Sequence, residues 1–295
     1  STTRPSVGYH ILALVTIAVW GTTFVSTKVL LSHGLTPPEI MFYRFIIAYA
    51  LTWIFTRKVW ADTWKDELLL ALAGFTGGTL YFLAENTALD YSITSNVALV
   101  VCVTPVLTAL LTSLCYKERI TARLVVGSVV ALLGVGFVVL NGTVLKIHPL
   151  GDALALVAAV AWAVYSVVIR RFDGCYTTWF VTRKVFFYGI VTMIPFIAAG
   201  MGGGLHLDKL TIPVVLGNVL FLSVLASMLC FYSWNLVLEK IGTIRASNYM
   251  YTQPLVSLAC SVAVLDEPIT PIALGGTVLI LSGIYLAEHG WKKRT

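Results

Sequence analysis

The sequence predicts an all-α membrane protein of ten transmembrane helices, arranged as two inverted five-helix repeats. Three observations support this prediction. First, 58% of the 295 residues are apolar and only 12% are charged, and the mean hydropathy of +0.88 is far above that of a soluble domain. Second, apolar stretches long enough to cross about 30 Å of hydrocarbon recur along the chain. Third, residues 80–139 recur 149 positions later as 229–288, with 13 identities in 60 ungapped positions. A duplication of this length indicates two copies of one half of the protein.

Each predicted span is a window of roughly 18 to 25 predominantly apolar residues. The ten spans cover 9–31, 38–56, 67–89, 94–114, 121–140, 150–170, 177–199, 212–236, 245–264 and 270–288. The first five form a predicted repeat over 1–145, and the last five form its copy over 146–295. The first span is too long for a cleavable signal peptide and is expected to stay as a helix.

The positively charged residues in the connections predict the orientation. With a cytoplasmic amino terminus, fourteen Lys and Arg residues lie inside, two lie outside, and the remaining four of the twenty fall within spans. Both termini are therefore expected in the cytoplasm. Because five is an odd number, the second repeat crosses the membrane in the opposite sense to the first. The net charge of +6 is then a topology signal, and no nucleic-acid partner is expected.

Two tryptophans occupy matching places in the first span of each repeat. Trp20 aligns with Trp162 at an offset of 142. Tryptophan usually anchors at the lipid headgroups, yet both residues lie near mid-span, where an indole N–H needs a polar partner or a wet cavity. They are either large residues packed between helices or part of a cavity lining.

A family resemblance is specific at three places: the run Trp20-Gly21-Thr22-Thr23-Phe24-Val25, Arg44 early in the second span, and the stretch from Pro105 to the Lys117-Glu118-Arg119-Ile120-Thr121 motif. Together they resemble the drug/metabolite transporter superfamily, and in particular its EamA-type ten-helix members. The resemblance covers the whole chain. It implies a central cavity lined by spans 1, 3, 4, 6, 8 and 9, with spans 5 and 10 packed outside. Relatives carry amino acids, aromatic compounds, quaternary amines or sugar derivatives, so the substrate stays open.

The third span is the most informative, because it carries an acid at membrane depth. Tyr81 and Glu85 are four residues apart and share a helix face, and Asn86 flanks them. An intramembrane carboxylate normally faces an interior or a water-filled path. Glu85 is either the partner of Lys28 or Arg44, or a contact for a cationic substrate group, or the site of a coupling proton. Arg44 in turn either snorkels to the outer surface, pairs with Glu85, or holds a gate shut.

Spans 4 and 9 contain matched prolines. Pro105 aligns with Pro254, and a proline within a span frees a backbone carbonyl and kinks the helix. Their matched placement favours hinges or unwound site segments. Span 9 is also unusually polar, so we expect Asn248 and Gln253 to face the cavity; the alternative is that they bond neighbouring helices together.

The aromatic residues predict the chemistry of the cavity. Trp20, Tyr81, Trp162, Tyr165 and Tyr251, with Trp234 further in, are predicted to surround a flat or cationic ligand. Such a pocket suits an amino acid, an aromatic metabolite or an organic cation better than a polyanion. The five cysteines and five histidines show no metal-ligand spacing, so neither a metal nor a cofactor is predicted.

The sequence contains no GxxxxGK[ST] motif for ATP, so transport is expected to use a gradient or to be passive. The resulting hypothesis is a secondary transporter of small metabolites in a bacterial inner membrane, not an enzyme, with export as the direction implied by the resemblance. An uptake carrier or exchanger is the alternative within this class, and a lipid-headgroup flippase is the alternative outside it. The expected partners are the small-molecule substrate and the lipid bilayer, with the proton as candidate coupling ion, in a monomer or homodimer.

Overall fold

The computed structural model describes residues 7–92, 94–139, 148–199, 204–256, 259 and 270–289. Helices account for every regular element in these ranges. In the first half they are α1 (Val7–Ser32), α2 (Pro37–Thr52), α3 (Trp64–Gly74), the π-helical η1 (Phe75–Leu80), α4 (Tyr81–Tyr91), α5 (Thr94–Val101), α6 (Thr104–Tyr116) and α7 (Ala122–Val139). In the second half they are α8 (Pro149–Ile169), η2 (Arg170–Phe172), α9 (Thr178–Ala198), η3 (Leu207–Thr211), α10 (Pro213–Leu220), the π-helical η4 (Phe221–Leu229), α11 (Cys230–Ile241), α12 (Thr243–Asn248), the 3₁₀-helical η5 (Tyr249–Thr252) and α14 (Pro271–His289).

The helices coincide with the predicted apolar stretches. Within the described ranges, five helical segments are long and apolar enough to cross a membrane: Trp64–Ala88, Leu99–Tyr116, Pro149–Phe172, Thr178–Ala198 and Pro213–Ile241. Shorter apolar helices lie at Val7–Thr23, Ala122–Val138 and Leu274–Ala287. Local sequence signals set several of the boundaries. Thr63 and Thr177, for example, cap α3 and α9 by accepting hydrogen bonds from the backbone N–H groups of Asp66 and Phe180, which would otherwise lack an intrahelical partner.

Two kinds of irregular segment recur at repeat-related positions. The π-helical η1 aligns with the second part of η4 at the offset of 149. The chain also leaves the α-helical path just before each matched proline. Before Pro105, the N–H of Val103 bonds to the carbonyl of Val100 at 3.0 Å, and η5 lies at the equivalent place before Pro254. Because proline lacks an N–H and clashes with the preceding turn, these interruptions follow directly from the sequence.

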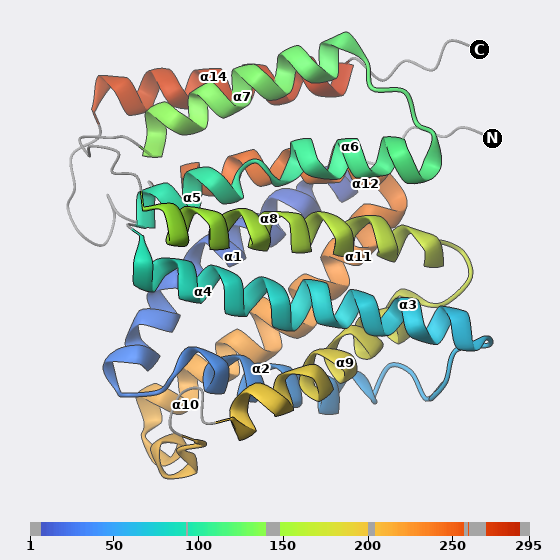
Figure 1. Ribbon diagram of the computed structural model, residues 1–295, viewed down its shortest axis with the longest axis vertical. Helices are drawn as coiled ribbons and strands as arrows, with labels where there is room; N and C mark the ends of the chain where they lie inside the picture. The colour runs from blue at the N-terminus through green and yellow to red at the C-terminus, as the bar shows by residue number, and fades with distance from the viewer. Residues whose placement is uncertain are drawn as a thin grey trace.

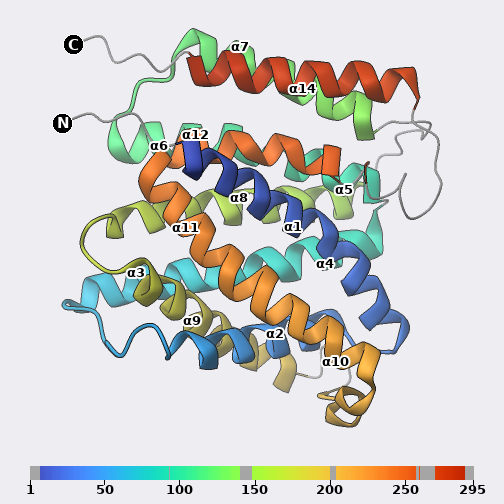
Figure 2. The same ribbon diagram turned by 180° about the vertical axis from the view of Figure 1, so that it is seen from behind.

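The bundle has an outer helix pair along one edge. In Figures 1 and 2, α7 and α14 lie side by side at the top, and α2, α9 and α10 lie at the opposite edge. A Cβ on Gly127 would come within 2.6 Å of the Gly283 carbonyl oxygen, and one on Gly134 within 2.6 Å of the Gly276 carbonyl oxygen. The four matched glycines therefore allow the two helices to touch along their backbones. This confirms the expectation that the fifth and tenth spans pack outside the centre.

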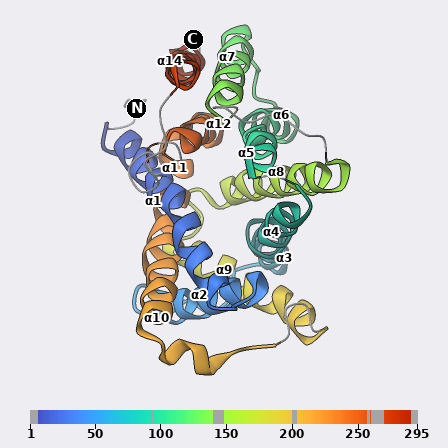
Figure 3. The same cartoon turned by 90° about the vertical axis from the view of Figure 1, so that its left-hand side faces the viewer.

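The centre of the molecule lies between two groups of helices. Viewed end-on in Figure 3, α1, α10 and α11 lie on one side, α3, α4 and α8 lie on the other, and α2 and α9 lie along one edge. α1 begins and α14 ends at the same end of the bundle (Figures 1 and 2). The loop from α2 to α3 and the loop from α8 to α9, both rich in basic residues, lie at that end as well (Figure 1).

Candidate functional site

Six aromatic side chains from both halves of the chain meet at the centre, and we call them the aromatic cluster. They are Trp20 of α1, Tyr81 of α4, Trp162 and Tyr165 of α8, and Phe231 and Trp234 of α11. The ring centroids of Trp20 and Trp162 are 5.4 Å apart, those of Trp20 and Trp234 are 5.5 Å apart, and those of Tyr81 and Trp162 are 5.0 Å apart. The rings are tilted or perpendicular to one another, which is the favoured geometry for aromatic pairs. Five of the predicted site residues are thus brought together.

The only indole N–H of the cluster that bonds within the protein belongs, among the described residues, to Trp20. Its Nε1 donates to the carbonyl oxygen of Ala226 in η4 at 2.9 Å. The Nε1 atoms of Trp162 and Trp234 are buried and have no hydrogen-bond partner in the described part of the chain. Gly77 of η1 is the repeat counterpart of Ala226, and the ring of Tyr165 lies against it, within 2.4 Å of where a Cβ would stand. Trp20 and Trp162 occupy equivalent positions in the two repeats, but in the described part of the chain only the indole of Trp20 donates to a backbone carbonyl.

An acid lies next to the aromatic cluster. The hydroxyl of Tyr81 donates to Oε1 of Glu85 at 2.8 Å, and Glu85 is half-buried. Asn86 beside it is half-buried too. In the second repeat, the position of Glu85 is taken by Trp234, one of the two indoles without a partner. The carboxylate and this N–H donor are thus contributed by equivalent turns of α4 and α11.

Arg44 on α2 does not reach the surface, because only 6% of the residue is exposed. Its Nε donates to Oγ of Ser227 at 2.8 Å, and its guanidinium lies 4.9 Å from the ring centroid of Phe82. Burial rules out the snorkelling interpretation. Among the described residues, Arg44 and Glu85 form no ion pair within 4.0 Å. The side chain of Lys28, the other predicted partner of Glu85, lies outside the described residues.

The buried amide of Asn235, next to the aromatic cluster, connects α8, α9 and α11. Asn235 accepts a hydrogen bond from the hydroxyl of Tyr165 at 2.5 Å and donates to Oγ1 of Thr182 at 2.9 Å. All three side chains are fully or almost fully buried. Both hydrogen-bonding groups of the amide are used, so Asn235 holds the ring of Tyr165 in place.

The polar residues of the predicted ninth span differ in burial and in the helices that they contact. Asn248 is 1% exposed, and neither its Oδ1 nor its Nδ2 has a partner among the residues described. Gln253 is half-buried. Tyr251 is fully buried but packs with Val135 of α7 and Ile280 of α14. It therefore belongs to the outer helix pair, away from the aromatic cluster.

Among the residues that the sequence prediction missed are Phe231, which contacts Trp20 and Trp162 at centroid distances of 5.9 and 5.8 Å, and Ser227, which accepts the hydrogen bond from Arg44. The alignment of the repeats contains a signal for Phe231, because Phe82 is identical to it at the offset of 149. Ser227 has no such signal, since its counterpart is Gly78, and only the position of Arg44 makes it important.

These features define a helical membrane transporter built from two repeats around an aromatic centre. Residues 8–140 and again 149–288 match the EamA-like transporter family. The chain belongs to this family, as the resemblance implied.

Relatives along almost the whole chain carry transporter names. An "Uncharacterized transporter" of Archaeoglobus fulgidus is 29% identical over 94% of this chain and 96% of its own. A "Probable amino-acid metabolite efflux pump" of Escherichia coli is 27% identical over 96% of each chain. A "Probable terminal-alkyne amino-acid exporter" of Streptantibioticus cattleyicolor is 25% identical over 94% of this chain and 92% of its own. One solved crystal structure has the same fold, with a TM-score of 0.78 at 20% identity over 99% of this chain and 100% of that one.

Proposed function

We propose that this protein is a secondary transporter that exports small zwitterionic metabolites, amino acids above all, by alternating access through the aromatic cluster. The observation that carries the proposal is the pair of buried indole N–H groups, on Trp162 and Trp234, without partners in the described residues. A buried donor without a partner costs about 1 to 3 kcal/mol. A ligand with an acceptor group that reaches the cluster recovers this cost.

The charges near the cluster favour a zwitterion as that ligand. Glu85 is positioned to bind an ammonium group, while the indole N–H groups and the cationic Arg44 favour a carboxylate. The faces of the surrounding rings suit an apolar or aromatic side chain and attract a cation within about 6 Å. Aromatic compounds and organic cations fit part of this arrangement, whereas an amino acid uses all of it. The relatives named for amino-acid or amino-acid metabolite export support the same substrate class and direction.

The repeat architecture supports the mechanism. In the proposed arrangement, ten spans form two inverted repeats in a bacterial inner membrane, with both termini in the cytoplasm. Each repeat then adopts in turn the conformation of the other, which exposes the centre to one side and then the other. The interruptions before Pro105 and Pro254, with the π-helical η1 and η4, are the proposed hinges, because π-segments often mark functional sites. Glu85 remains the candidate for binding a coupling proton.

Thermal unfolding of the detergent-purified protein with a panel of amino acids, aromatic acids and quaternary amines tests the proposal. A ligand that binds only the folded state raises the melting temperature. We expect amino acids to stabilise the wild type and Glu118→Gln, a control that removes an acid outside the cluster, paired with Arg170 at 2.6 Å. We expect no stabilisation of Glu85→Gln. An equal shift in both variants contradicts the role of Glu85, and the absence of any shift with amino acids in the wild type contradicts the substrate class.

A further inference from the structure

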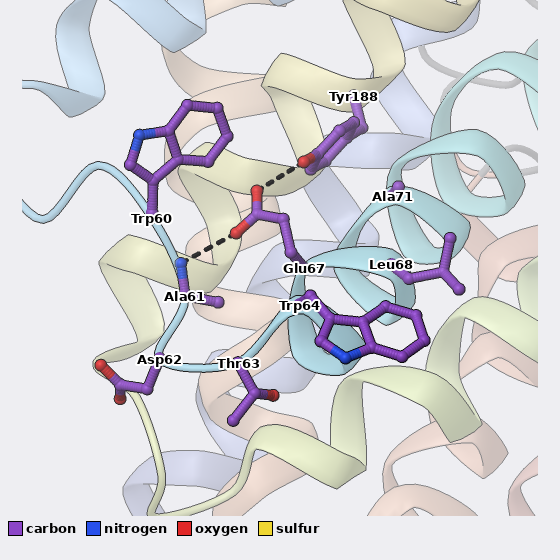
Figure 4. Close-up of a pocket in the computed structure, with 9 residues that line it drawn as sticks. All are labelled: Trp60, Ala61, Asp62, Thr63, Trp64, Glu67, Leu68, Ala71 and Tyr188. Atoms are coloured by element: carbon purple, nitrogen blue, oxygen red, sulfur yellow. Dashed lines mark hydrogen bonds between the residues drawn. The ribbon is translucent and has the colours of Figure 1, made fainter.

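A cavity that does not include the aromatic cluster opens on the surface of the bundle beside α3 and α9. Its volume is about 520 Å³, within the range of small-molecule sites. We call it the α3–α9 pocket. Its residues come from the loop before α3 (Trp60 to Thr63), from the first turns of α3 (Trp64, Glu67, Leu68, Ala71) and from α9 (Tyr188), as Figure 4 shows.

The carboxylate at the back of the pocket is fully engaged by the protein. Glu67 pairs with Lys184 and accepts hydrogen bonds from the hydroxyl of Tyr188 and, at 2.8 Å, from the N–H of Ala61. Figure 4 shows the last two bonds. The Lys184 ammonium also lies 4.4 Å from the ring centroid of Trp60. Because this charge is neutralised and its acceptor sites are occupied, Glu67 forms a neutral wall and does not attract a free organic cation.

The front of the pocket is apolar and faces away from the protein. Leu68 is 62% exposed, Leu72 one turn further on is 39% exposed, and Trp64 is 72% exposed. These residues open the segment Trp64–Ala88, which is apolar enough to cross a membrane. Trp60, 62% exposed, lies on the opposite side of the pocket from Trp64 (Figure 4). Tryptophans at the start of a span are typical of the boundary between hydrocarbon and headgroups.

One exposed acid lines the pocket, and a lysine outside the lining pairs with it. Asp62 lines the pocket, and its side chain is 66% exposed. The Nζ of Lys58 lies 2.6 Å from Oδ1 of Asp62, and the Lys58 side chain is 43% exposed. The Nζ of Lys58 also lies 4.7 Å from the ring centroid of Tyr176. Exposed pairs of this kind contribute little to stability, so a ligand can compete for both groups. An apolar floor below a dipolar rim matches a molecule with a hydrocarbon body and a zwitterionic head.

We propose that the α3–α9 pocket binds a phospholipid of the cytoplasmic leaflet whose headgroup is a phosphoethanolamine. Its acyl chains lie over Leu68 and Ala71, its phosphate contacts Lys58, and its primary ammonium donates to the carboxylate of Asp62. A quaternary choline headgroup has no N–H to donate, and a glycerol headgroup has no cation. The proposal rests on the proposed orientation of the protein in the membrane. Because Tyr188 of α9 lines the pocket together with the residues of α3, a lipid that fills it links the two repeats at their proposed cytoplasmic end.

Native mass spectrometry of the purified protein, delipidated and then titrated with phosphatidylethanolamine, phosphatidylcholine or phosphatidylglycerol of identical acyl chains, tests the proposal. Leu68→Trp fills the pocket, and Leu114→Trp makes the same change at a site that is 77% exposed on α6. We expect one phosphatidylethanolamine to be retained at least tenfold more tightly than the other lipids by the wild type and Leu114→Trp. We expect Leu68→Trp to lose this retention and Asp62→Asn to lose the preference for ethanolamine over choline.

Three outcomes contradict the proposal: equal retention of all three lipids, unchanged retention in Leu68→Trp, or displacement of the lipid by an amino acid that the protein binds. Lipid retention in detergent does not depend on transport. In the same preparations, Leu68→Trp is expected to keep the amino-acid-dependent thermal shift of the wild type, because Leu68 is not part of the aromatic cluster. Failure of the lipid site is therefore distinguishable from failure of the proposed transport function.

Discussion

The indole N–H of Trp20 donates to the carbonyl of Ala226 at 2.9 Å, which ties the first span of one repeat to the π-helical segment of the other. The equivalent indole, Trp162, packs against the ring of Trp20 but has no hydrogen-bond partner in the described part of the chain. Two residues at the same place in the repeats thus perform different tasks. Trp20 joins the halves, and Trp162 keeps a donor available.

The variants Trp20→Phe and Trp162→Phe separate these tasks, because both remove similar ring volume and one N–H. Trp20→Phe also leaves the carbonyl of Ala226 without its donor, so we expect it to lower the free energy of unfolding by about 1 kcal/mol more than Trp162→Phe. Trp162→Phe is expected to weaken amino-acid binding about tenfold, the value of one hydrogen bond to a charged group. Denaturant unfolding and ligand titration of the same samples measure both quantities. The reverse order of stabilities contradicts the structural assignment.

The contact between α7 and α14 predicts a strong effect of a single methyl group. A Cβ on Gly127 meets the backbone of Gly283 and Ala287 at 2.6 Å, so Gly127→Ala must push the helices apart. We expect a loss of about 1 to 3 kcal/mol, as in other overpacked contacts. Gly136→Ala on the same helix is the matched control, because its Cβ meets nothing within 4 Å, and better helix propensity is worth up to about 1 kcal/mol there. Thermal melts of the two variants should shift in opposite directions; a shift of equal sign and size contradicts the prediction.

The ion pair between Glu67 and Lys184 predicts that substitutions of the two residues have non-additive effects on stability. The side chains are 17% and 4% exposed, so Lys184→Met leaves a shielded carboxylate without its cation. We expect that variant to lose about 3 kcal/mol of stability. In Glu67→Gln/Lys184→Met both charges are absent. The single amide oxygen of the glutamine can accept from the N–H of Ala61 while its NH2 group donates to the hydroxyl oxygen of Tyr188, so much of the loss should be recovered. A double-mutant cycle by chemical denaturation measures the coupling, and simple additivity contradicts it.

Asp173, in the loop between α8 and α9, predicts a pH dependence of stability. Partial desolvation, reinforced by repulsion from Glu239, raises the pKa of Asp173 to about 6, above its ordinary value of 3.8. A pKa that is raised in the folded state means that the protonated form favours folding. The stabilisation is complete below the ordinary pKa and is lost as the pH rises through about 6.

We therefore expect the wild type to lose stability relative to Asp173→Asn between about pH 4 and pH 6, and the difference to be constant above about pH 7. Because Asp173 is exposed, screening by solvent should keep the effect below about 1 kcal/mol. Unfolding of both proteins over this pH range provides the measurement. A wild type that gains stability relative to Asp173→Asn with rising pH contradicts the sign of the shift.

The sequence predicts the structure best at positions where one residue type has one physical consequence. The interruptions before Pro105 and Pro254 and the glycine contact between α7 and α14 follow from a missing N–H and a missing side chain. The meeting of Trp20 with Trp162 and the joining of Tyr81 to Glu85 follow from their matching positions in the repeats and from helix spacing. The sequence predicts that Tyr251 lines the central cavity, but the residue packs against the outer helix pair. A buried tyrosine in a polar span can face either the centre or an outer helix.

By itself, the sequence determined the helical class, the duplication and the apolar spans, because these depend on composition and periodicity, which are local properties of the chain. The tertiary structure alone decided which groups have partners. Arg44 donates to Ser227, a residue 183 positions away, instead of reaching the surface, and one indole of two equivalent ones finds a carbonyl. Such contacts depend on side chains that distant helices bring within hydrogen-bond distance, and no pattern along the chain encodes that distance.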